Sequence, residues 1–583
     1  MCGIVGYAGR RPAAEIIYEG LTMLEYRGYD SAGIAALSDG AIFVEKRQGR
    51  VSALKEGVQN LSGNIGIGHT RWATHGKPSD KNAHPHICGK FAIVHNGIIE
   101  NYAELKSLYF DGEHFNSETD SEVIVRLLDK FYDGDLLSAL KCVCSLLKGS
   151  YAVAVICADF EGLALAKRGN PAIIGFGDGE NFVASDAPAL SFCKEITVLD
   201  DGDIALITDN RVAIFDENLQ GVIRARLPNL ATVASLELGD NPHYMIKEIR
   251  EVPASIEKTT AAYKTVVSKV VGLIKNLKRV IFVGCGTAYN ACLIAKRYIE
   301  IYAHIPAEAD IAGEFRYKNP VISEGTLIVA VSQSGETADT VEAAKLARSL
   351  GAKVIAVTNA PYSEITRIAD AVVPVAAGSE ICVAATKSYT GQITALYLLA
   401  LTLAGKYPSE KISAMPELSK TMLECKGIDT VADMCARASG VYFLGRDIDY
   451  AVAQEGSLKL KEISYIPSEG YPAGELKHGT LALIDIRAVA VVIITNPRLA
   501  EKSLNAVEQV LSRRGKVAVI SNVEGIESKL AGRALLLKIP ACDEYLSPLL
   551  SAIAVQLIAY KTALLLDRDP DKPRNLAKSV TVE

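Results

Sequence analysis

An internal repeat limits most strongly what this chain can fold into. Residues 280–284 (Val-Ile-Phe-Val-Gly) and residues 441–445 (Val-Tyr-Phe-Leu-Gly) are each followed by a tyrosine five positions on, and residues 350–359 are echoed by residues 514–522. Both pairs are offset by roughly 160 residues, about the length of one domain. Strands followed by long helical patterns are typical of parallel βαβ units. The pattern therefore predicts a duplicated, doubly wound α/β domain; the alternative is a chance agreement of generic βαβ rhythm.

The first 235 residues have a different rhythm. Short β-rich runs at residues 65–68, 91–94, 151–157 and 212–215 are separated by Gly, Asp and Asn turns, as expected for antiparallel sheets. A polar segment rich in Gly and Pro at residues 237–242 suits a linker between the two parts.

Length sets the number of domains. A chain of 583 residues is too long for one core, and ~150 residues per domain predicts three or four domains. We expect a first domain at 1–235, a linker at 236–247, α/β domains at 248–415 and 416–570, and a catalytic C-terminal tail at 571–583.

The composition argues against several classes of partner. A net charge of −6 argues against nucleic acid, because no basic stripe is available to neutralise phosphates. Twelve singly spread cysteines and the lack of a signal peptide indicate a reducing cytosol. The longest apolar run, residues 393–404, falls short of the ~20 residues that span a bilayer. We expect a buried helix there, and a soluble cytoplasmic protein.

A hydroxyl-rich turn follows the apolar run at residues 327–331. Residues 332–337 (Ser-Gln-Ser-Gly-Glu-Thr) then open a helical pattern. Ligands of open α/β sheets bind at the carboxyl ends of strands, and free N–H groups at a helix start attract anions. The segment predicts a phosphate site; the alternative is simple N-capping by Ser332 or Ser334. Residues 284–287 form a weaker glycine-rich turn that lacks the dinucleotide fingerprint.

Charged side chains cluster near the end of the second repeat. Glu455, Lys459 and Glu462 share one face of a predicted helix, and His478 follows sixteen residues later. In the tail, Lys578 stands among apolar neighbours, where desolvation would lower its pKa and make it an amine nucleophile. The alternatives are a solvated charged face, a surface loop and a frayed terminus.

Cys2 stands directly behind Met1. Removal of Met1 would leave a thiol beside an α-amine with a pKa near 7.7–8.0, which can act as the base for that thiol. The alternative is that Cys2 merely begins a buried edge strand.

Five of the nine histidines lie between residues 69 and 95. Their spacing is not that of a zinc site, and zinc would poison a nearby thiol, so we expect no metal.

Eight segments together resemble one family. In chain order they resemble the glutamine–fructose-6-phosphate aminotransferases (isomerizing), or glucosamine-6-phosphate synthases, from Cys2 to Glu583. The segments are residues 2–6, 26–33, 69–76, 95–97, 332–337, 459–464, 474–479 and 575–583.

For the first domain, the resemblance implies an N-terminal-nucleophile glutaminase with an αββα fold. Cys2 would attack the side-chain amide of glutamine, and Asn96 with the Gly97 N–H would form the oxyanion hole. Arg71 would hold the α-carboxylate of glutamine and Asp120 its α-amine. The glutamine-binding set is Arg71, Trp72, Thr74, His75, Gly97 and Asp120. Released ammonia would pass through an internal channel gated by Trp72.

For the second part, the resemblance implies two tandem sugar-isomerase (SIS) domains. The set expected to bind fructose 6-phosphate is Ser332, Gln333, Ser334, Thr337, Thr287, Val383 and Ala577. Lys578 would form a Schiff base with the ketone, and Glu462, supported by Lys459, would carry a proton from C1 to C2. His478 would assist ring opening from the partner subunit of a homodimer. The products would be glutamate and glucosamine 6-phosphate, in the first step of hexosamine synthesis, with no cofactor.

Two positions depart from the family pattern. Ala288 and Ala385 stand where the family usually has serine in its sugar-phosphate pocket. Two lost hydroxyl donors would cost ~1 kcal/mol each or shift the sugar preference.

Two rival functions are weighed against this one. An amidophosphoribosyltransferase needs paired acids in a diphosphosugar loop; the nearest match, residues 198–203, is better interpreted as a β-turn. A sugar-phosphate sensor would need neither Cys2 nor the set of Glu462, His478 and Lys578.

Overall fold

Two units make up the chain in this computed structural model, which describes residues 2–231, 236–273 and 276–581. The first unit comprises Met1–Glu237 with Ala577–Glu583, and the second comprises Leu238–Leu576. Residue 235, the expected end of the first domain, lies outside the described residues.

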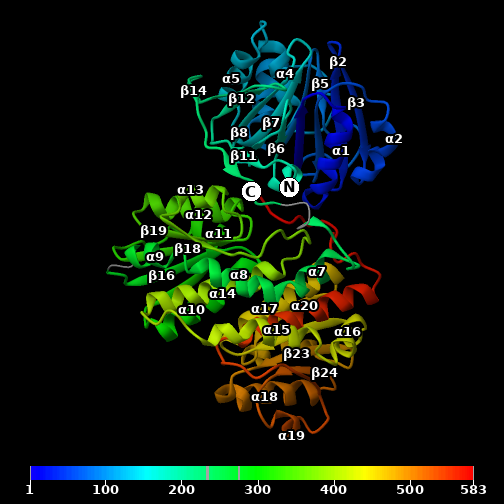
Figure 1. Ribbon diagram of the computed structural model, residues 1–583. Coiled ribbons are helices and arrows are strands. Elements are labelled where there is room, and N and C mark those ends of the chain that lie inside the picture. Colours follow the sequence, from blue (N-terminus) through cyan, green and yellow to red (C-terminus); the bar gives the residue numbers. More distant parts are fainter. Residues whose placement is uncertain (1, 232–235, 274–275, 582–583) are drawn as a thin grey trace. The chain divides into compact units, whose positions relative to one another are not determined.

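The described residues of the first unit form two antiparallel sheets (Figure 1). The eight-stranded sheet has the order β15-β11-β9-β10-β1-β4-β2-β3, and the seven-stranded sheet has the order β14-β13-β12-β8-β7-β6-β5. The first sheet consists of β1 (Gly3–Ala8), β2 (Ser31–Ser38), β3 (Ala41–Gln48), β4 (Ile65–Arg71), β9 (Ile173–Phe176), β10 (Asn181–Ala184), β11 (Glu195–Val198) and β15 (Leu227–Pro228). The second consists of β5 (His86–Cys88), β6 (Phe91–Ile99), β7 (Gly149–Cys157), β8 (Leu163–Arg168), β12 (Ile204–Ile207), β13 (Val212–Phe215) and β14 (Gly221–Val222).

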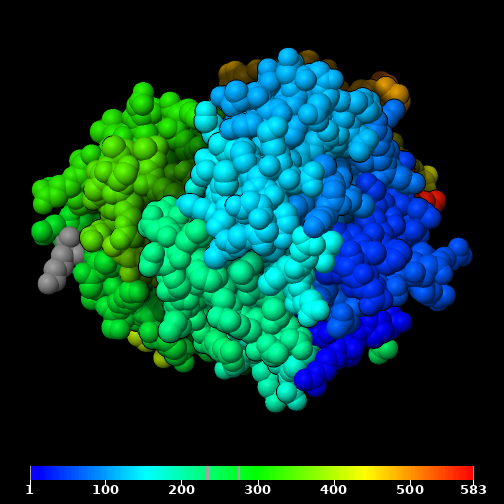
Figure 2. Space-filling model, turned by 90° about the horizontal axis from the view of Figure 1, so that it is seen from above, coloured from blue at the N-terminus to red at the C-terminus, as the bar shows by residue number. Residues whose placement is uncertain are grey.

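Alternation along the strands builds four layers. In β6, Ala92 and Val94 face the first sheet and share a core with Ile4. The intervening Ile93 faces the other way, into a core with the helices. These helices are α3 (Tyr102–Phe110), α4 (Glu122–Phe131) and α5 (Leu136–Leu146), and their outer faces form much of the light-blue surface in Figure 2. Helix α1 (Ala13–Met23) covers the first sheet. The layering is αββα, as expected; a short α2 spans Lys55–Val58.

The second unit contains two five-stranded parallel sheets with the same strand order. One is β17-β16-β18-β19-β20 and the other is β22-β21-β23-β24-β25. Their bounds are β16 (Arg279–Gly284), β17 (Ala307–Ile311), β18 (Thr326–Ser332), β19 (Lys353–Thr358), β20 (Ala371–Pro374), β21 (Gly440–Gly445), β22 (Ser468–Pro472), β23 (Ala488–Ile494), β24 (Lys516–Ser521) and β25 (Leu535–Lys538). The repeated segments 280–284 and 441–445 lie in β16 and β21, at the same place in each sheet. The predicted duplication is confirmed.

Helices join the two sheets of the second unit into one core. At its centre α17 packs against α20 and α10, and α10 packs against α14 (Figure 1). The helices are α7 (Tyr244–Arg250), α8 (Val252–Tyr263), α9 (Val267–Leu273), α10 (Thr287–Tyr302), α11 (Ala312–Tyr317), α12 (Ala338–Ser349), α13 (Glu364–Ile368), α14 (Lys387–Leu403), α15 (Met415–Leu423), α16 (Ile428–Ala436), α17 (Ile448–Ser464), α18 (Ala500–Leu511), α19 (Ile526–Leu530) and α20 (Ser547–Leu565).

Two of these helices are strongly apolar. Helix α14 carries the apolar run 393–404 and is buried along nearly all its length, as predicted. Helix α20 is long and apolar enough to cross a membrane by composition alone, but 83% of that stretch is buried inside the protein. Its burial is that of a core helix.

The strand order fixes where a ligand can bind. From β16 the chain continues to β17 on one side, whereas β18 and β19 lie on the other. The carboxyl ends of β16 and β18 therefore meet at a switch point, where open α/β sheets leave a crevice. Gly284 and Ser332 end these two strands.

Candidate active site

Cys2 directly precedes β1, which pairs with β4 so that Gly3 lies opposite Thr70. This register brings Cys2 beside the segment that follows β4. Its Sγ accepts the backbone N–H of Trp72 at 3.3 Å and lies 3.6 Å from the Trp72 carbonyl oxygen. Burial raises the pKa of the Cys2 thiol, while the Trp72 N–H and the charge of Arg71 oppose the rise.

Asn96 lies against the same residue. Its Nδ2 donates to the Cys2 carbonyl oxygen at 3.0 Å, and its Oδ1 lies 3.0 Å from His69 Nε2. Burial lowers the pKa of His69 to about 3, so this ring is neutral and its Nε2–H can hold the Asn96 amide in one orientation. Gly97 has φ +136°, and a Cβ there would lie 1.9 Å from the Ser150 carbonyl oxygen, so only glycine fits.

Arg71 and Asp120 are both buried near these residues. Arg71 Nη2 donates to the carbonyl oxygens of His75 and Gly76, whereas Nη1 has no partner among the described residues. A buried guanidinium with one unused donor is suited to a carboxylate ligand. Asp120 accepts the Ile99 N–H at 2.8 Å. Of the other expected glutamine ligands, Trp72 and His75 are half-buried and Thr74 is exposed.

The segment 26–33 also supports the nucleophile, in roles that the sequence did not reveal. Arg27 Nε donates to the Cys2 carbonyl oxygen at 3.1 Å, and Asp30 accepts the Ala73 N–H at 2.8 Å. A Cβ on Gly28 would lie 2.7 Å from the Arg71 carbonyl carbon. The motif was visible in the sequence, but its contacts depend on strand pairing across 40 residues.

The hydroxyl-rich loop 332–337 begins where β18 ends. Ser332 Oγ accepts the Gly335 N–H at 3.0 Å and lies 3.0 Å from Thr337 Oγ1, and Ser334 Oγ accepts the Glu336 N–H at 3.2 Å. Thr337 precedes α12 without a side-chain cap bond. The hydroxyls thus shape the loop rather than cap the helix. Gln333 is held through its carbonyl oxygen, which accepts the Asn359 N–H at 3.1 Å.

A second loop of this unit carries Val383. The Val383 N–H donates to the Asp571 carbonyl oxygen at 3.0 Å, and Cys382 Sγ lies 3.4 Å from the Pro570 carbonyl oxygen. These contacts fix the start of the tail. Further along the tail, Ala577 and Lys578 are half-buried and group with the first unit.

Helix α17 carries the predicted charged face. Lys459 Nζ lies 2.6 Å from Glu462 Oε2 and 3.5 Å from Glu455 Oε1. Thr287, an expected sugar-phosphate ligand, instead donates to Glu455 at 3.0 Å in this structure. Burial raises the pKa of Glu455 to about 7. Burial would lower the pKa of Lys459, but the charges of Glu462 and Glu455 outweigh it and raise that pKa.

His478 and the two alanines that depart from the family pattern lie outside α17. His478 is exposed at the end of the 3₁₀ turn Glu475–His478. Ala288 is in the first turn of α10, and Ala385 precedes Thr386.

The acidic segment 198–203 forms the predicted turn. The Asp203 N–H donates to the Asp200 carbonyl oxygen at 3.1 Å. Arg224 pairs with Asp200 and Asp203, and Lys167 pairs with Asp201. These acids are thus occupied by the chain's own cations, which disfavours a diphosphosugar loop.

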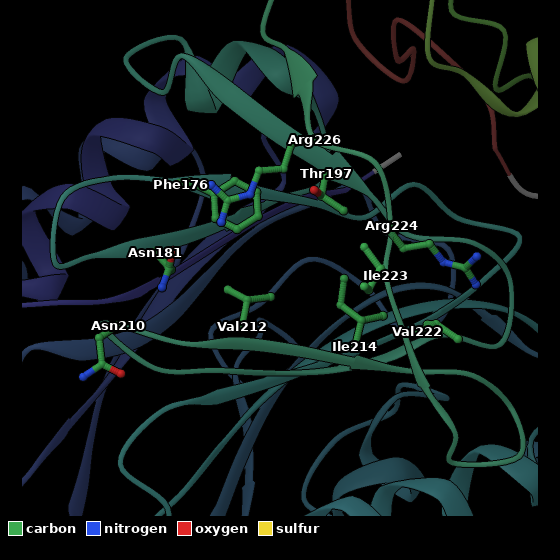
Figure 3. A pocket seen from close by; sticks show the side chains of 10 residues that line it. All are labelled: Phe176, Asn181, Thr197, Asn210, Val212, Ile214, Val222, Ile223, Arg224 and Arg226. Atoms are coloured by element: carbon green, nitrogen blue, oxygen red, sulfur yellow. The ribbon is translucent and has the colours of Figure 1, made fainter.

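A cavity of about 210 Å³ opens between the edges of the two sheets in the first unit (Figure 3). Arg226 lies over the Phe176 ring at 4.0 Å, and Arg224 points away from the cavity toward its acids. The lining offers no nucleophile or base. No group of three or more His, Cys, Asp or Glu suited to a metal occurs among the described residues.

Two family models match the chain. The SIS domain matches residues 273–402 and 434–566, and the glutamine amidotransferase domain matches residues 69–191. The chain is 45% identical over 614 residues to the glutamine–fructose-6-phosphate aminotransferase [isomerizing] of Caldanaerobacter subterraneus subsp. tengcongensis. It is 44% identical over 595 residues to the protein of that name in Aquifex aeolicus. Both alignments cover 100% of each chain.

Solved structures resemble the second unit. The C-terminal domain of glucosamine-fructose-6-phosphate aminotransferase from Francisella tularensis is 33% identical, with a TM-score of 0.54 over 58% of this chain and 99% of that one. The tagatose-6-phosphate ketose/aldose isomerase of Escherichia coli is 16% identical, with a TM-score of 0.51 over 57% of this chain and 95% of that one, and shows the fold alone.

Proposed function

The chain belongs to the glutamine–fructose-6-phosphate aminotransferase (isomerizing) family, and we infer that it converts L-glutamine and D-fructose 6-phosphate to L-glutamate and D-glucosamine 6-phosphate. The observation that carries this is the full-length match to relatives of that name. One chain contains both the Cys2–Asn96 arrangement and the Lys459–Glu462 pair. The product starts hexosamine synthesis.

In the glutaminase step, removal of Met1 frees the α-amine of Cys2 as a base. The thiol attacks the side-chain amide carbon of glutamine, ammonia leaves, and water hydrolyses the thioester to glutamate. Asn96 Nδ2, already aimed at the Cys2 backbone, and the Gly97 N–H stabilise the oxyanion. The unused Nη1 of Arg71 binds the α-carboxylate of glutamine, and Asp120 the α-amine.

In the isomerase step, loop 332–337 binds the phosphate at the switch point, with Thr287, Val383 and Ala577 completing the sugar site. After ring opening, the Lys578 amine condenses with the C2 carbonyl to a Schiff base, and the carbonyl oxygen leaves as water. Ammonia then adds to this imine and the lysine leaves as its free amine. Glu462 removes a proton from C1 and returns it to C2, which turns the imine into the amino sugar. The adjacent Lys459 ammonium, 2.6 Å from Oε2, holds the Glu462 carboxylate in place.

Ammonia must reach the second site unprotonated, because ammonium has no lone pair with which to attack a carbonyl. We propose an internal channel with Trp72 as its gate. The direct contact between the Trp72 backbone and Cys2 Sγ supports this, because it couples the gate position to the nucleophile.

We also propose that the enzyme acts in the cytoplasm as a homodimer, without nucleic-acid or membrane partners. His478 would serve the sugar of the partner subunit, and its exposure on the 3₁₀ turn supports that role. The boundaries 1–235, 236–247, 248–415, 416–570 and 571–583 remain our proposed domains. Sedimentation analysis tests the dimer, and a monomer with full activity contradicts it.

A direct assay tests the proposed function. The protein is incubated with glutamine and fructose 6-phosphate, and glutamate and glucosamine 6-phosphate are measured. Equal amounts of both are expected. Glutamate without amino sugar contradicts the substrate assignment, and neither product would favour a sugar-phosphate sensor. Phosphoribosyl diphosphate in place of the hexose tests the amidophosphoribosyltransferase alternative, for which no product is expected.

A further inference from the structure

Glu455 is a buried carboxylate to which the mechanism above gives no task. Its side chain is completely buried on α17, one turn before Lys459. Two residues of α10 hold it: Thr287 Oγ1 donates to Oε1 at 3.0 Å and Asn290 Nδ2 donates to Oε2 at 2.8 Å. An isolated buried charge costs several kcal/mol, so a carboxylate in the core needs partners. Glu455 has two hydrogen-bond donors and the Lys459 ammonium, and its charge in turn acts on that ammonium.

Lys459 links this carboxylate to the proposed proton carrier. Its side chain is 1% exposed and lies between Glu455 and Glu462, whereas Glu462 is 21% exposed. The three residues thus form a row along α17 that runs from a fully buried carboxylate to a partly exposed one. The ammonium of Lys459 has two carboxylates within 3.5 Å. A closer approach to one carboxylate weakens its electrostatic attraction to the other.

Among the residues that the structure describes, the groups that face this row come from three further elements. Tyr389 of α14 interacts electrostatically with Glu455, and its buried hydroxyl has no partner among the described residues. Cys382 of the loop 379–386 interacts with Lys459. From α10, only the neutral Thr287 and Asn290 contact Glu455. The row's own cation is therefore Lys459, and Glu455 is the charge that competes for it.

We propose that Glu455 is a positioning residue of the isomerase site: by sharing the Lys459 ammonium, it sets how strongly that ammonium holds Glu462 and so keeps Glu462 basic enough to take the C1 proton. The inference rests on the proposed function and adds a residue to it. When Glu455 is ionised, Lys459 is shared and Glu462 is the stronger base. When Glu455 is protonated, Lys459 turns wholly to Glu462, whose basicity falls.

The pH dependence of sugar isomerisation distinguishes this role from a structural one. Burial raises the pKa of Glu455 to about 7, so the rate of fructose 6-phosphate isomerisation without glutamine falls as pH drops through that value. In Glu455→Gln the charge is absent at every pH. We expect kcat to fall by about tenfold, less than the 10²–10⁴ that a placed proton-transfer group contributes, because Glu462 itself is still present. KM should be nearly unchanged, and the pH–rate profile should have no acidic limb near pH 7.

A second variant should shift the acidic limb of the pH–rate profile without removing the Glu455 carboxylate. Asn290→Leu deletes one donor to the ionised form, which raises the pKa of Glu455 and shifts the limb to higher pH. Asp449→Asn is the matched control: it removes another buried carboxylate of α17, which bonds Thr495 rather than Lys459, and should leave the limb in place. Glutaminase activity checks folding of the first unit, and circular dichroism and thermal melting check the second.

The outcomes separate the two levels of inference. A wild-type enzyme that makes no amino sugar overturns the proposed function. A productive wild-type enzyme whose Glu455→Gln variant keeps both its kcat and its limb overturns the role of Glu455. If Glu455→Gln does not fold, Asn290→Leu decides: an upward shift supports the role and an unmoved limb overturns it.

Discussion

The thiol of Cys2 accepts the backbone N–H of Trp72 at 3.3 Å, a contact between residues 70 positions apart in the chain. It exists because β1 and β4 pair in a register that sets Gly3 opposite Thr70. The proposed nucleophile and the proposed channel gate are therefore adjacent through backbone geometry.

Replacing Cys2 tests whether the two active sites are separable. Cys2→Ala should lose glutamine hydrolysis and glutamine-dependent synthesis, because the nucleophile is gone. Fructose 6-phosphate isomerisation should stay within about twofold of wild type, because that chemistry needs only groups of the isomerase site; a twofold change is only about 0.4 kcal/mol in the barrier. Coupled assays of glutamate and glucose 6-phosphate measure both. Loss of both activities contradicts separate sites.

The amino terminus of the purified protein should begin at Cys2. While Met1 is attached, the Cys2 nitrogen is an amide and cannot act as a base. Intact-mass spectrometry measures the terminus, and a sample with uncleaved Met1 should lack glutaminase activity but retain isomerisation. An active glutaminase that retains Met1 would exclude the α-amine as the base.

Gly97→Ala should damage the glutaminase through its backbone. A Cβ at this residue would lie 1.9 Å from the Ser150 carbonyl oxygen, in a conformation with φ +136°. We expect a loss of about 2–4 kcal/mol in unfolding free energy of the first unit and a collapse of glutamine hydrolysis. Denaturant titration measures the first and glutamate release the second. Gly112→Ala, at positive φ but with open space around it, is the control for backbone strain alone.

The repeated segments were sufficient to predict the α/β duplication, because parallel strands buried on both faces leave a strong apolar signature in β16 and β21. The helix face of Glu455, Lys459 and Glu462 followed from the 3.6-residue period. The bond from Thr287 to Glu455 could not be predicted, because it joins α10 to α17 across 168 positions and depends on how two helices pack. The roles of Arg27 and Asp30 depend likewise on strand pairing.

Borohydride should trap the sugar on Lys578. Reduction of the proposed Schiff base in the presence of fructose 6-phosphate converts the imine to a stable secondary amine, and peptide mapping by mass spectrometry locates it. Lys578→Arg should abolish the adduct, since a guanidinium forms no such imine. An adduct on another lysine, or on Lys578 without sugar phosphate, would contradict the assignment.

The stability of the second unit should depend on pH through Glu455. Its pKa in the folded protein is about 7, above the ordinary 4.5, so the folded state binds the proton more tightly than the unfolded state. The contribution of Glu455 protonation to the free energy of unfolding is therefore fully present below about pH 4.5. It is lost as pH rises toward 7, by about 3 kcal/mol across that window. Glu455→Gln cannot titrate and should flatten that part of the pH profile of unfolding free energy. The surface variant Asp433→Asn, which breaks an exposed pair with Arg437, should keep the wild-type slope. A wild-type profile that instead rises between pH 4.5 and 7, and is unchanged by Glu455→Gln, would show that Glu455 is ionised in the folded protein throughout this range.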